Sequence, residues 1–291
     1  NTYTDSIQDA DVILFNSHHN PKQVLKLQEH YQEHLFVHRV DGPMSYRGKS
    51  GLRLDQRIFH LNSLVADGTV FQSEWSRSQT IKEKLIFSNS NTVIINAPDS
   101  EIFYAKDKKN SYFEKRKVRL IASSWSSNQM KGTDLFSFLD NNLDFNDYSM
   151  SFAGNIDRSF KNISLLGQLD SSHLADQLRS HDIFIFASER EACSNSLLEA
   201  LHSGLPVVCR NSSSNPEILG EGGILFEDST DLLEKIDILR RDHQKYKENI
   251  KVMKIADIHN DYINFFSSLK VNDQKKKLNF KEKLKFKLGL I

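Results

Sequence analysis

Two carboxylates in one stretch of the chain, Glu191 and Glu199, have the spacing and surroundings of groups that bind a substrate. An apolar run that we expect to form a buried strand ends near Ser188, and a polar loop and a helix over residues 194–201 follow it. Glu191 lies in the loop, and Glu199 lies about two helical turns further on, on the side that faces the loop. Free backbone N–H groups at the start of such a helix form a site for phosphate. Two carboxylates that flank this site suit the hydroxyl groups of a sugar and of a ribose.

The elements around this segment alternate in type along the chain. Short, nearly continuous apolar runs predict strands that are covered on both faces, and the longer amphipathic stretches between them predict helices. Strands are expected at residues 11–16, 35–40, 68–72, 92–96, 118–123, 148–153, 183–187, 206–209 and 223–226. Helices are expected at residues 21–31, 54–64, 73–84, 133–139, 174–178 and 194–201. This alternation predicts an α/β fold with a mostly parallel sheet, which binds ligands at the carboxyl ends of its strands.

The segment from Glu191 to Val208 resembles the E-x7-E signature of retaining glycosyltransferases with the GT-B fold, and is most similar to glycosyltransferase group 1, or family 4. Glu191 and Glu199 are followed by Ala-Leu-His-Ser-Gly-Leu-Pro-Val-Val at 200–208. The resemblance is specific over about residues 118–226 and fainter over 11–103, where the order of elements fits. It implies two Rossmann-like, doubly wound domains that face a cleft, the first of which lacks its N-terminal strand and helix.

The same resemblance implies that the second domain binds a nucleotide-diphosphate sugar, with no cofactor and no metal. Glu191 would then be a catalytic residue that contacts the sugar hydroxyls, Glu199 would contact the ribose, and Lys131 would bind the diphosphate. The remaining donor-binding residues implied in this way are Cys193, Ser194, Asn195, Ser196 and Leu197, through their backbone N–H groups, and Gly154, Asn155, Leu166 and Gly167. The family commonly has an arginine shortly before this lysine, whereas residues 123–127 contain Trp125 and no arginine.

The first domain is expected to supply the acceptor site. His38 and Asp41 end a predicted strand just before a Gly-Pro turn, and either of them is a candidate to assist deprotonation of the acceptor or to hold the donor. The alternative is that His38 is a structural strand residue and that Asp41 caps the turn. Ser17, His18 and His19 end another strand on the same expected edge and form a weaker candidate.

Composition excludes several other functions. The 38 basic residues balance 38 acidic ones, so overall charge does not favour nucleic acid as a partner. Two cysteines, Cys193 and Cys209, are too few for a disulfide scaffold or a cysteine-built zinc site, and they fit a reducing compartment. The sequence has neither a Gly-x-Gly-x-x-Gly turn after a strand nor a phosphate-loop Gly-Lys-Ser/Thr run, which argues against a nicotinamide-dependent oxidoreductase and a phosphate-loop nucleotidase.

Three regions are predicted: an incomplete N-terminal acceptor-side domain at 1–105, a nucleotide-sugar-binding domain at 106–257, and a C-terminal helix with a basic tail at 258–291. The missing initiator Met and the short first domain favour a fragment of a longer chain. Residues 270–291 contain eight lysines and two acidic residues, interleaved with leucine and phenylalanine. Such a segment suits an anionic membrane surface, and the alternatives are a solvated terminus or one that packs on the N-terminal domain.

The sequence therefore predicts a retaining glycosyltransferase of the hexosyltransferase type, cytoplasmic and either free or membrane-associated. Its partners would be a sugar nucleotide and a glycan or lipid-linked acceptor, as in polysaccharide biosynthesis. The alternative is a non-catalytic nucleotide-sugar-binding protein, or a degenerate subunit that requires a partner.

Overall fold

A computed structural model describes residues 6–16, 20–45, 48–88, 90–106, 113 and 116–271. The candidate residues Ser17, His18 and His19 lie outside this part of the chain, as do residues 272–291 of the basic tail.

The chain forms two compact units, and the first is discontinuous in sequence. Unit 1 comprises Asn1–Ile95 and Ala256–Ile291, and unit 2 comprises Asn96–Ile255. The first boundary lies ten residues before the predicted one at 105/106. The segment after Ile95 belongs to unit 2 because it packs there: the Ile102 carbonyl accepts a hydrogen bond from Arg179 Nη1 at 2.7 Å.

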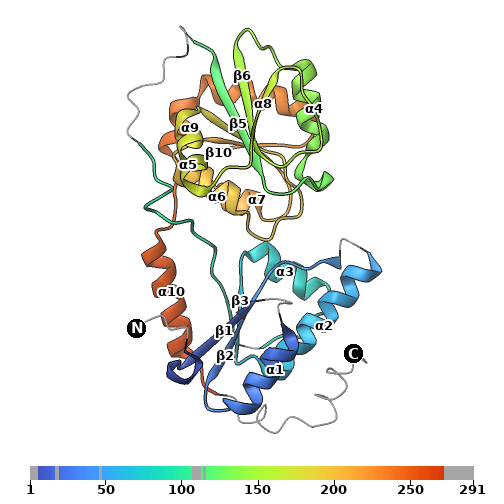
Figure 1. The fold of residues 1–291 in the computed structure, drawn as a ribbon, viewed down its shortest axis with the longest axis vertical. Helices are drawn as coiled ribbons and strands as arrows, with labels where there is room; N and C mark the ends of the chain where they lie inside the picture. Colours follow the sequence, from blue (N-terminus) through green and yellow to red (C-terminus); the bar gives the residue numbers. More distant parts are fainter. Residues whose placement is uncertain are drawn as a thin grey trace. The chain divides into compact units, whose positions relative to one another are not determined.

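Unit 1 contains a four-stranded parallel sheet in the order β1-β2-β3-β4 (Figure 1). Its elements are a short 3-10 helix, Ile7–Asp9, then β1 (Val12–Asn16), α1 (Pro21–His30), β2 (Leu35–Val40), α2 (Lys49–Val65), β3 (Gly68–Phe71), α3 (Glu74–Lys82), β4 (Asn91–Val93) and, from the end of the chain, α10 (Ile255–Ser268). Fully enclosed side chains from β1, β2, α1 and α2 form one core cluster, which includes Phe15, Leu25, Phe36 and Leu61.

The helix α10 returns to unit 1 and packs against β3. A Cβ built on Gly68 would lie 2.7 Å from Leu269 and 2.9 Å from Phe265, so only glycine leaves room for these side chains. The C-terminal helix is thus part of the N-terminal unit, whereas the prediction treated residues 258–291 as a separate region.

Unit 2 contains a six-stranded parallel sheet in the order β10-β9-β8-β5-β6-β7. Its strands are β5 (Val118–Ser124), β6 (Tyr148–Gly154), β7 (Ile163–Gly167), β8 (Ile183–Phe186), β9 (Val207–Arg210) and β10 (Gly223–Phe226). Its helices are the 3-10 helix η3 (Gln129–Lys131), α4 (Thr133–Asn142), α5 (Ser171–Ser180), α6 (Asn195–His202), α7 (Asn215–Leu219), α8 (Ser229–Arg241) and α9 (His243–Glu248).

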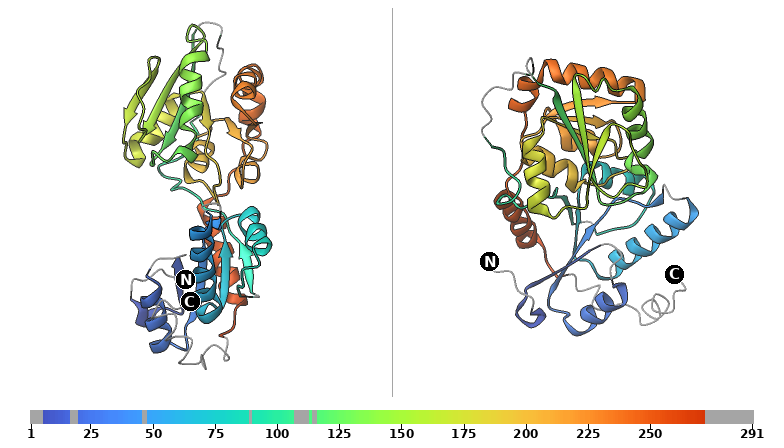
Figure 2. Two further views of the ribbon diagram at one scale, coloured as in Figure 1. Left: turned by 90° about the vertical axis from the view of Figure 1, so that its right-hand side faces the viewer. Right: turned by 45° about the horizontal axis from the view of Figure 1, so that its top comes forward.

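Helices lie on both faces of this sheet (Figure 2). Leu135 and Leu139 of α4 and Ile236 of α8 share one core cluster with the central strands. The chain order reverses between β5 and β8, because β6 continues from β5 on one side while β8 pairs with β5 on the other. Such a reversal is the point at which open α/β sheets bind ligands, beyond the carboxyl ends of the strands.

The predicted α/β class with parallel sheets is confirmed, and the strands at 35–40 and 223–226 match β2 and β10 residue for residue. The prediction missed β7, an edge strand in which only Ile163 is fully buried, so its sequence carries no continuous apolar run. It also missed α8, although Asp228 caps that helix and Leu232, Ile236 and Leu239 recur on one face.

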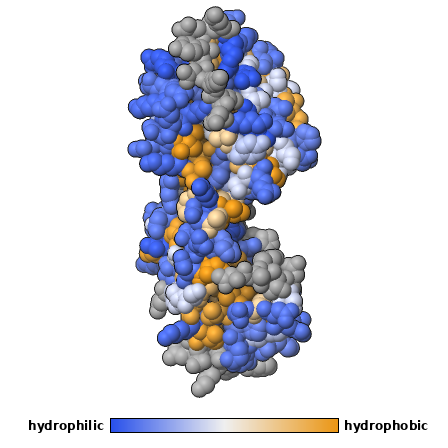
Figure 3. Space-filling view, turned by 90° about the vertical axis from the view of Figure 1, so that its left-hand side faces the viewer, coloured by the Kyte–Doolittle hydropathy of each residue, from blue (hydrophilic) through white to orange (hydrophobic). Residues whose placement is uncertain are grey.

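The surface seen in Figure 3 is mainly hydrophilic, with apolar areas between the polar ones. Large apolar side chains that stand partly free of the core include Leu14, Ile86, Trp125 and Leu165. Among the helices that the structure describes, none combines the length and the apolar character needed to cross a bilayer.

Candidate active site

The loops that follow β5 and β8 meet at the reversal point of the second sheet. Lys131 ends η3, just after β5, and Glu191 lies in the loop after β8. Their side chains form an ion pair, from Lys131 Nζ to Glu191 Oε1, although 60 positions separate them in the sequence. The two groups keep 32% and 18% of their side-chain surface exposed, so both remain within reach of a ligand.

Lys131 is positioned by a tight turn that requires glycine at position 132. Gly132 has a positive φ of 84°, and a Cβ there would lie 2.4 Å from Ala187 Cβ at the end of β8. The Asn128 side chain caps the turn by accepting a hydrogen bond from the Met130 N–H at 3.0 Å. The Glu189 N–H donates to the Met130 carbonyl at 2.9 Å and joins the two loops. The close packing of these two loops therefore fixes where Lys131 stands.

The backbone of Glu191 is held from the loop that follows β9. Its N–H donates to Ser213 Oγ at 2.8 Å, and its carbonyl accepts from Ser214 Oγ at 2.8 Å. Asn215 Nδ2 donates to the Ser188 carbonyl at 2.9 Å and so anchors the start of the loop that carries Glu191. Ser213, Ser214 and Asn215 were not among the sequence candidates, because their contribution depends on the neighbouring position of β8 and β9 rather than on a local pattern.

The helix α6 begins directly after this loop. Ser194 is its N-cap, and the serine side chain makes no capping hydrogen bond, since Ser194 Oγ lies 3.1 Å from Ser196 Oγ instead. Cys193, Ser194, Asn195, Ser196 and Leu197 thus lead into and form the first turn, as predicted. The Leu197 side chain is fully buried, so only its backbone can face a ligand. An N-terminal turn without a side-chain cap favours an anion.

Glu199 lies in the body of α6 and is largely buried. Its Oε2 atom is buried and has no hydrogen-bond partner. Burial raises the pKa of this carboxyl group to about 7. A buried acceptor without a partner is costly in a folded protein, and it fits a carboxylate that accepts a hydroxyl hydrogen bond from a ligand.

The other predicted donor-side residues lie near the ends of β6 and β7. Gly154 has a φ of 109°, and a Cβ there would lie 1.9 Å from the Ser124 carbonyl oxygen. Asn155 Nδ2 donates to the Trp125 carbonyl at 3.0 Å, and Asn155 Oδ1 accepts from Gln168 Nε2 at 2.8 Å. The Asn155 amide therefore links two loops.

A small pocket adjoins these strand ends. Its lining is formed by Ser123, Ser124, Trp125, Ala153, Gly154, Leu169 and Leu174. Of the four residues predicted in this region, Gly154 lines the pocket, whereas Asn155, Leu166 and Gly167 do not.

The two acceptor-side candidates in unit 1 differ in exposure. His38 is fully buried in β2, stacks on Phe15 with ring centroids 4.3 Å apart, and places Nδ1 3.0 Å from Asn62 Nδ2. This placement contradicts an accessible catalytic His38 and favours its structural alternative, because a ring enclosed by the core does not reach a substrate. Asp41 follows β2 and is partly exposed, and it accepts a hydrogen bond from Gln72 Nε2. The Oε1 atom of Gln72 accepts a hydrogen bond from Arg39 at 2.9 Å.

Within the described residues, no three His, Cys, Asp or Glu side chains gather as they would around an ion.

Comparisons with known proteins relate this chain to glycosyltransferases. Residues 148–242, which include Glu191 and Glu199, match the family model described as "Glycosyl transferases group 1". No curated protein sequence matches this chain.

Several solved structures are similar in fold. Sucrose-phosphate synthase from Thermosynechococcus elongatus is 14% identical, with a TM-score of 0.66 over 89% of this chain and 74% of that chain. HepE from Anabaena, solved with UDP-glucose, is 16% identical, with a TM-score of 0.68 over 89% of this chain and 79% of its own. A glycosyltransferase from Rickettsia africae is 16% identical, with a TM-score of 0.62 over 97% of this chain and 76% of its own. The chain therefore has the GT-B fold of these glycosyltransferases, and residues 148–242 of its second unit match the group 1 glycosyltransferase model.

Proposed function

We propose that the chain transfers a hexose-type sugar, with retention of anomeric configuration, from a nucleotide-diphosphate sugar to a glycan or lipid-linked acceptor in polysaccharide biosynthesis. One observation carries this proposal: Lys131, Glu191 and the uncapped start of α6 all belong to the reversal point of the second sheet. A cation, a carboxylate and free N–H groups at such a point suit a ligand that is both anionic and rich in hydroxyl groups.

The proposed roles of Lys131, Glu191 and Glu199 follow from their contacts in the structure: the first two form an ion pair, and Glu199 Oε2 has no hydrogen-bond partner. The diphosphate would take the place of Glu191 as the partner of Lys131, and it would accept hydrogen bonds from the first turn of α6. Glu191 is then released from its ion pair and is free to bind sugar hydroxyls. Glu199 Oε2, which has no partner in the free protein, would accept a ribose hydroxyl.

In this proposal Lys131 and the N–H groups of α6 stabilise the charge that develops on the departing diphosphate. They supply this stabilisation without a cofactor or a metal. The acceptor oxygen bonds to the anomeric carbon on the face from which the nucleoside diphosphate leaves. Asp41 stays our candidate for the proton acceptor of that step, since it is the accessible one of the two predicted residues.

The first experiment is a thermal-shift panel of the chain with UDP, GDP, ADP and TDP. A ligand at 100 times its Kd stabilises the folded state by about 2.7 kcal/mol. We expect one nucleotide to raise the melting temperature, and Lys131→Ala and Glu199→Ala to weaken its binding by tenfold or more, whereas Lys235→Ala on α8 leaves it unchanged. A folded sample that binds none of the four would contradict the proposal.

A second candidate, a nucleotide-sugar-binding protein without turnover, is favoured by one departure from the family pattern. Residues 123–127 carry Trp125 and no arginine, so less positive charge is available for a leaving diphosphate. Binding of a sugar nucleotide, without release of nucleoside diphosphate in the presence of any acceptor tested, would support this candidate over the enzyme.

We place the proposed reaction in the cytoplasm. Both cysteines are free, and Cys209 is buried, as suits a reducing compartment. Membrane association through residues 270–291 remains an expectation from the sequence, as does a lipid-linked acceptor.

A further inference from the structure

Two residues beside the candidate donor site have a backbone conformation that amino acids other than glycine rarely adopt. Arg190, in the loop after β8, has a φ of 56°, and Ser213, in the loop after β9, has a φ of 52°. In the described part of the chain, the other two non-glycine residues with a positive φ are Asn20 and Lys84, which belong to unit 1. In unit 2 this conformation is therefore confined to the two loops around Glu191.

A non-glycine residue in this region is strained, and it persists only where its surroundings hold it. Here the restraints are hydrogen bonds between the two loops. The Glu191 N–H donates to Ser213 Oγ, and Ser214 Oγ donates to the Glu191 carbonyl, each at 2.8 Å. The Arg190 N–H donates to Ser212 Oγ at 3.4 Å. Three consecutive serines, residues 212–214, thus hold the backbone on both sides of the bond from Arg190 to Glu191.

These three serines are themselves anchored to the sheet of unit 2. The Ser214 side chain is fully buried. The next residue, Asn215, donates from Nδ2 to the Ser188 carbonyl at 2.9 Å and to the Arg210 carbonyl at 3.1 Å. Ser188 follows β8 and Arg210 ends β9, so the anchor joins the carboxyl ends of two neighbouring strands.

The Glu191 side chain has a separate restraint, which is its ion pair with Lys131. Within the described residues, the Glu191 carboxylate has no other hydrogen-bond or ion-pair partner. In the proposed function, a diphosphate replaces Glu191 as the partner of Lys131. The direction of the carboxylate in that complex is then set by its backbone, which depends on the φ of Arg190 and on the serine hydrogen bonds.

We propose that Ser213 is a positioning residue for recognition of the donor sugar. Its hydroxyl group holds the Glu191 backbone in the orientation that directs the carboxylate to the sugar hydroxyls. The strain at Arg190 and Ser213 is retained because relaxed loops would turn Glu191 away from the sugar. This inference rests on the proposed function, in which Glu191 binds the sugar and Lys131 binds the diphosphate.

The test compares the affinity of two probes for the full chain by isothermal calorimetry. One probe is the nucleoside diphosphate that binds in the thermal-shift panel, and the other is whichever of its glucose, galactose and mannose conjugates binds most tightly. The ratio of the two Kd values measures the contribution of the sugar. Ser213→Ala should reduce the preference for the conjugate about tenfold, as for the loss of one hydrogen bond to a charged group. It should leave the affinity for the nucleoside diphosphate unchanged, because Lys131 and α6 are intact.

Ser213→Gly separates positioning from stability. Glycine adopts a φ of 52° without strain, whereas alanine does not. Ser213→Gly should therefore have a higher melting temperature than Ser213→Ala, and yet it should lose the same preference for the sugar conjugate, because both variants lack the hydroxyl group. A residue that only stabilised the fold would not give this combination.

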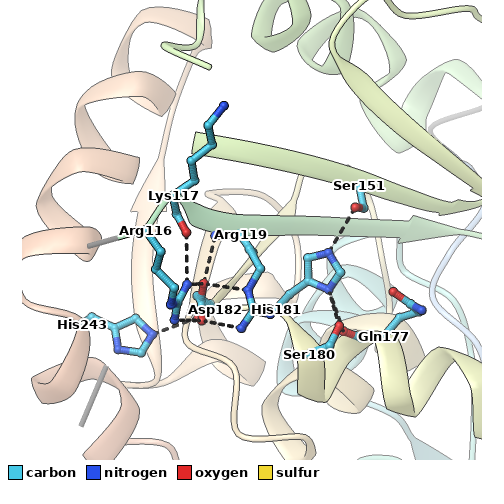
Figure 4. A network of polar contacts seen from close by, with 9 residues as sticks. All are labelled: Arg116, Lys117, Arg119, Ser151, Gln177, Ser180, His181, Asp182 and His243. Carbon is cyan, nitrogen blue, oxygen red and sulfur yellow. Dashed lines mark hydrogen bonds and ion pairs between the residues drawn. The ribbon is translucent and has the colours of Figure 1, made fainter. Parts of the chain in front are cut away.

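Ser151→Ala is the matched control. Ser151 Oγ lies 3.1 Å from His181 Nε2 in the network shown in Figure 4, so this variant also loses a serine hydroxyl contact within unit 2. His181 comes before β8, whereas Glu191 follows that strand, so the contact lies away from the two loops. Ser151→Ala should keep the affinity of both probes.

The outcomes distinguish this inference from the proposed function. A folded parent that binds none of the nucleotides would contradict the proposed function, and the inference with it. If the parent binds a nucleotide but the ratio of affinities is the same in Ser213→Ala and Ser213→Gly, the inference alone is overturned. An equal loss of affinity for both probes would also overturn it, because Ser213 would then support the donor site as a whole.

Discussion

Glu199 carries the least satisfied carboxyl group of the candidate donor site, and this has a consequence for stability. Its pKa is about 7 in the folded chain, against an ordinary 4.5, because burial disfavours the charged form. The folded state therefore holds this proton more tightly than the unfolded state does. This tighter proton binding stabilises the folded state fully below about pH 4.5. The stabilisation, about 3 kcal/mol at most, is lost as the pH rises through 7.

We predict that Glu199→Gln flattens this dependence. Urea unfolding at pH 5 and at pH 8 should show a smaller loss of stability between the two values for Glu199→Gln than for the parent, because the amide does not ionise. Glu234→Gln, an exposed glutamate on α8, serves as the control and should keep the slope of the parent. Identical slopes for Glu199→Gln and the parent would show that the carboxyl group is not desolvated in solution.

His38 gives the second prediction at the scale of single residues. Because the ring is buried between Phe15 and Asn62, His38→Ala should reduce the free energy of unfolding by about 2–4 kcal/mol, as for other large core deletions. Turnover per folded molecule should change little. Asp41→Asn should show the opposite, with nearly unchanged unfolding and a loss of turnover while nucleotide affinity is kept. Loss of turnover in a stable His38→Ala would restore the catalytic hypothesis.

Among the elements, the turn that ends at Gly132 is the part on which the position of Lys131 depends most. Gly132→Ala combines a positive φ with a clash against Ala187, so the loops after β5 and β8 must move apart. We expect a loss of stability of about 2–3 kcal/mol and a tenfold or larger loss of nucleotide affinity, measured by urea unfolding and calorimetry.

Gly167→Ala is the matched control, because its φ is 69° and a Cβ there meets nothing within 4 Å. Gly167→Ala should lose only about 1 kcal/mol of stability, the cost of placing alanine at a positive φ. If the two variants lost equal stability, the packing of Gly132 on Ala187 would not matter to the fold.

Prediction from sequence succeeded where one element carries its own signal. The strands at 35–40 and 223–226 were located from apolar runs, and the loop and helix around Glu191 and Glu199 from a motif. It could not give the ion pair between Lys131 and Glu191, because that contact requires β5 and β8 to be neighbours in the sheet. It also left the burial of His38 open, since burial depends on the cover that α1 and α2 provide.

At the scale of the whole molecule, unit 1 is completed by the last described helix of the chain. Leu269→Ala should remove a contact that covers Gly68 and destabilise unit 1 by about 2–4 kcal/mol. Hydrogen exchange should become faster in β1, β2 and β3, while β5 and β8 keep their protection. Equal acceleration in both units would mean that they unfold as one.

This discontinuity also sets an order for synthesis on the ribosome. The face of β3 at Gly68 leaves the exit tunnel long before Phe265 and Leu269 do, since all of residues 96–255 are translated in between. At the usual rate of about 5–20 residues per second, this interval lasts roughly 10 to 40 seconds. During this interval the face of the N-terminal sheet at Gly68 stays uncovered. Unit 2 is therefore the first unit whose residues have all been synthesised. A chaperone that shields apolar surface would act on the sheet of unit 1 during that interval.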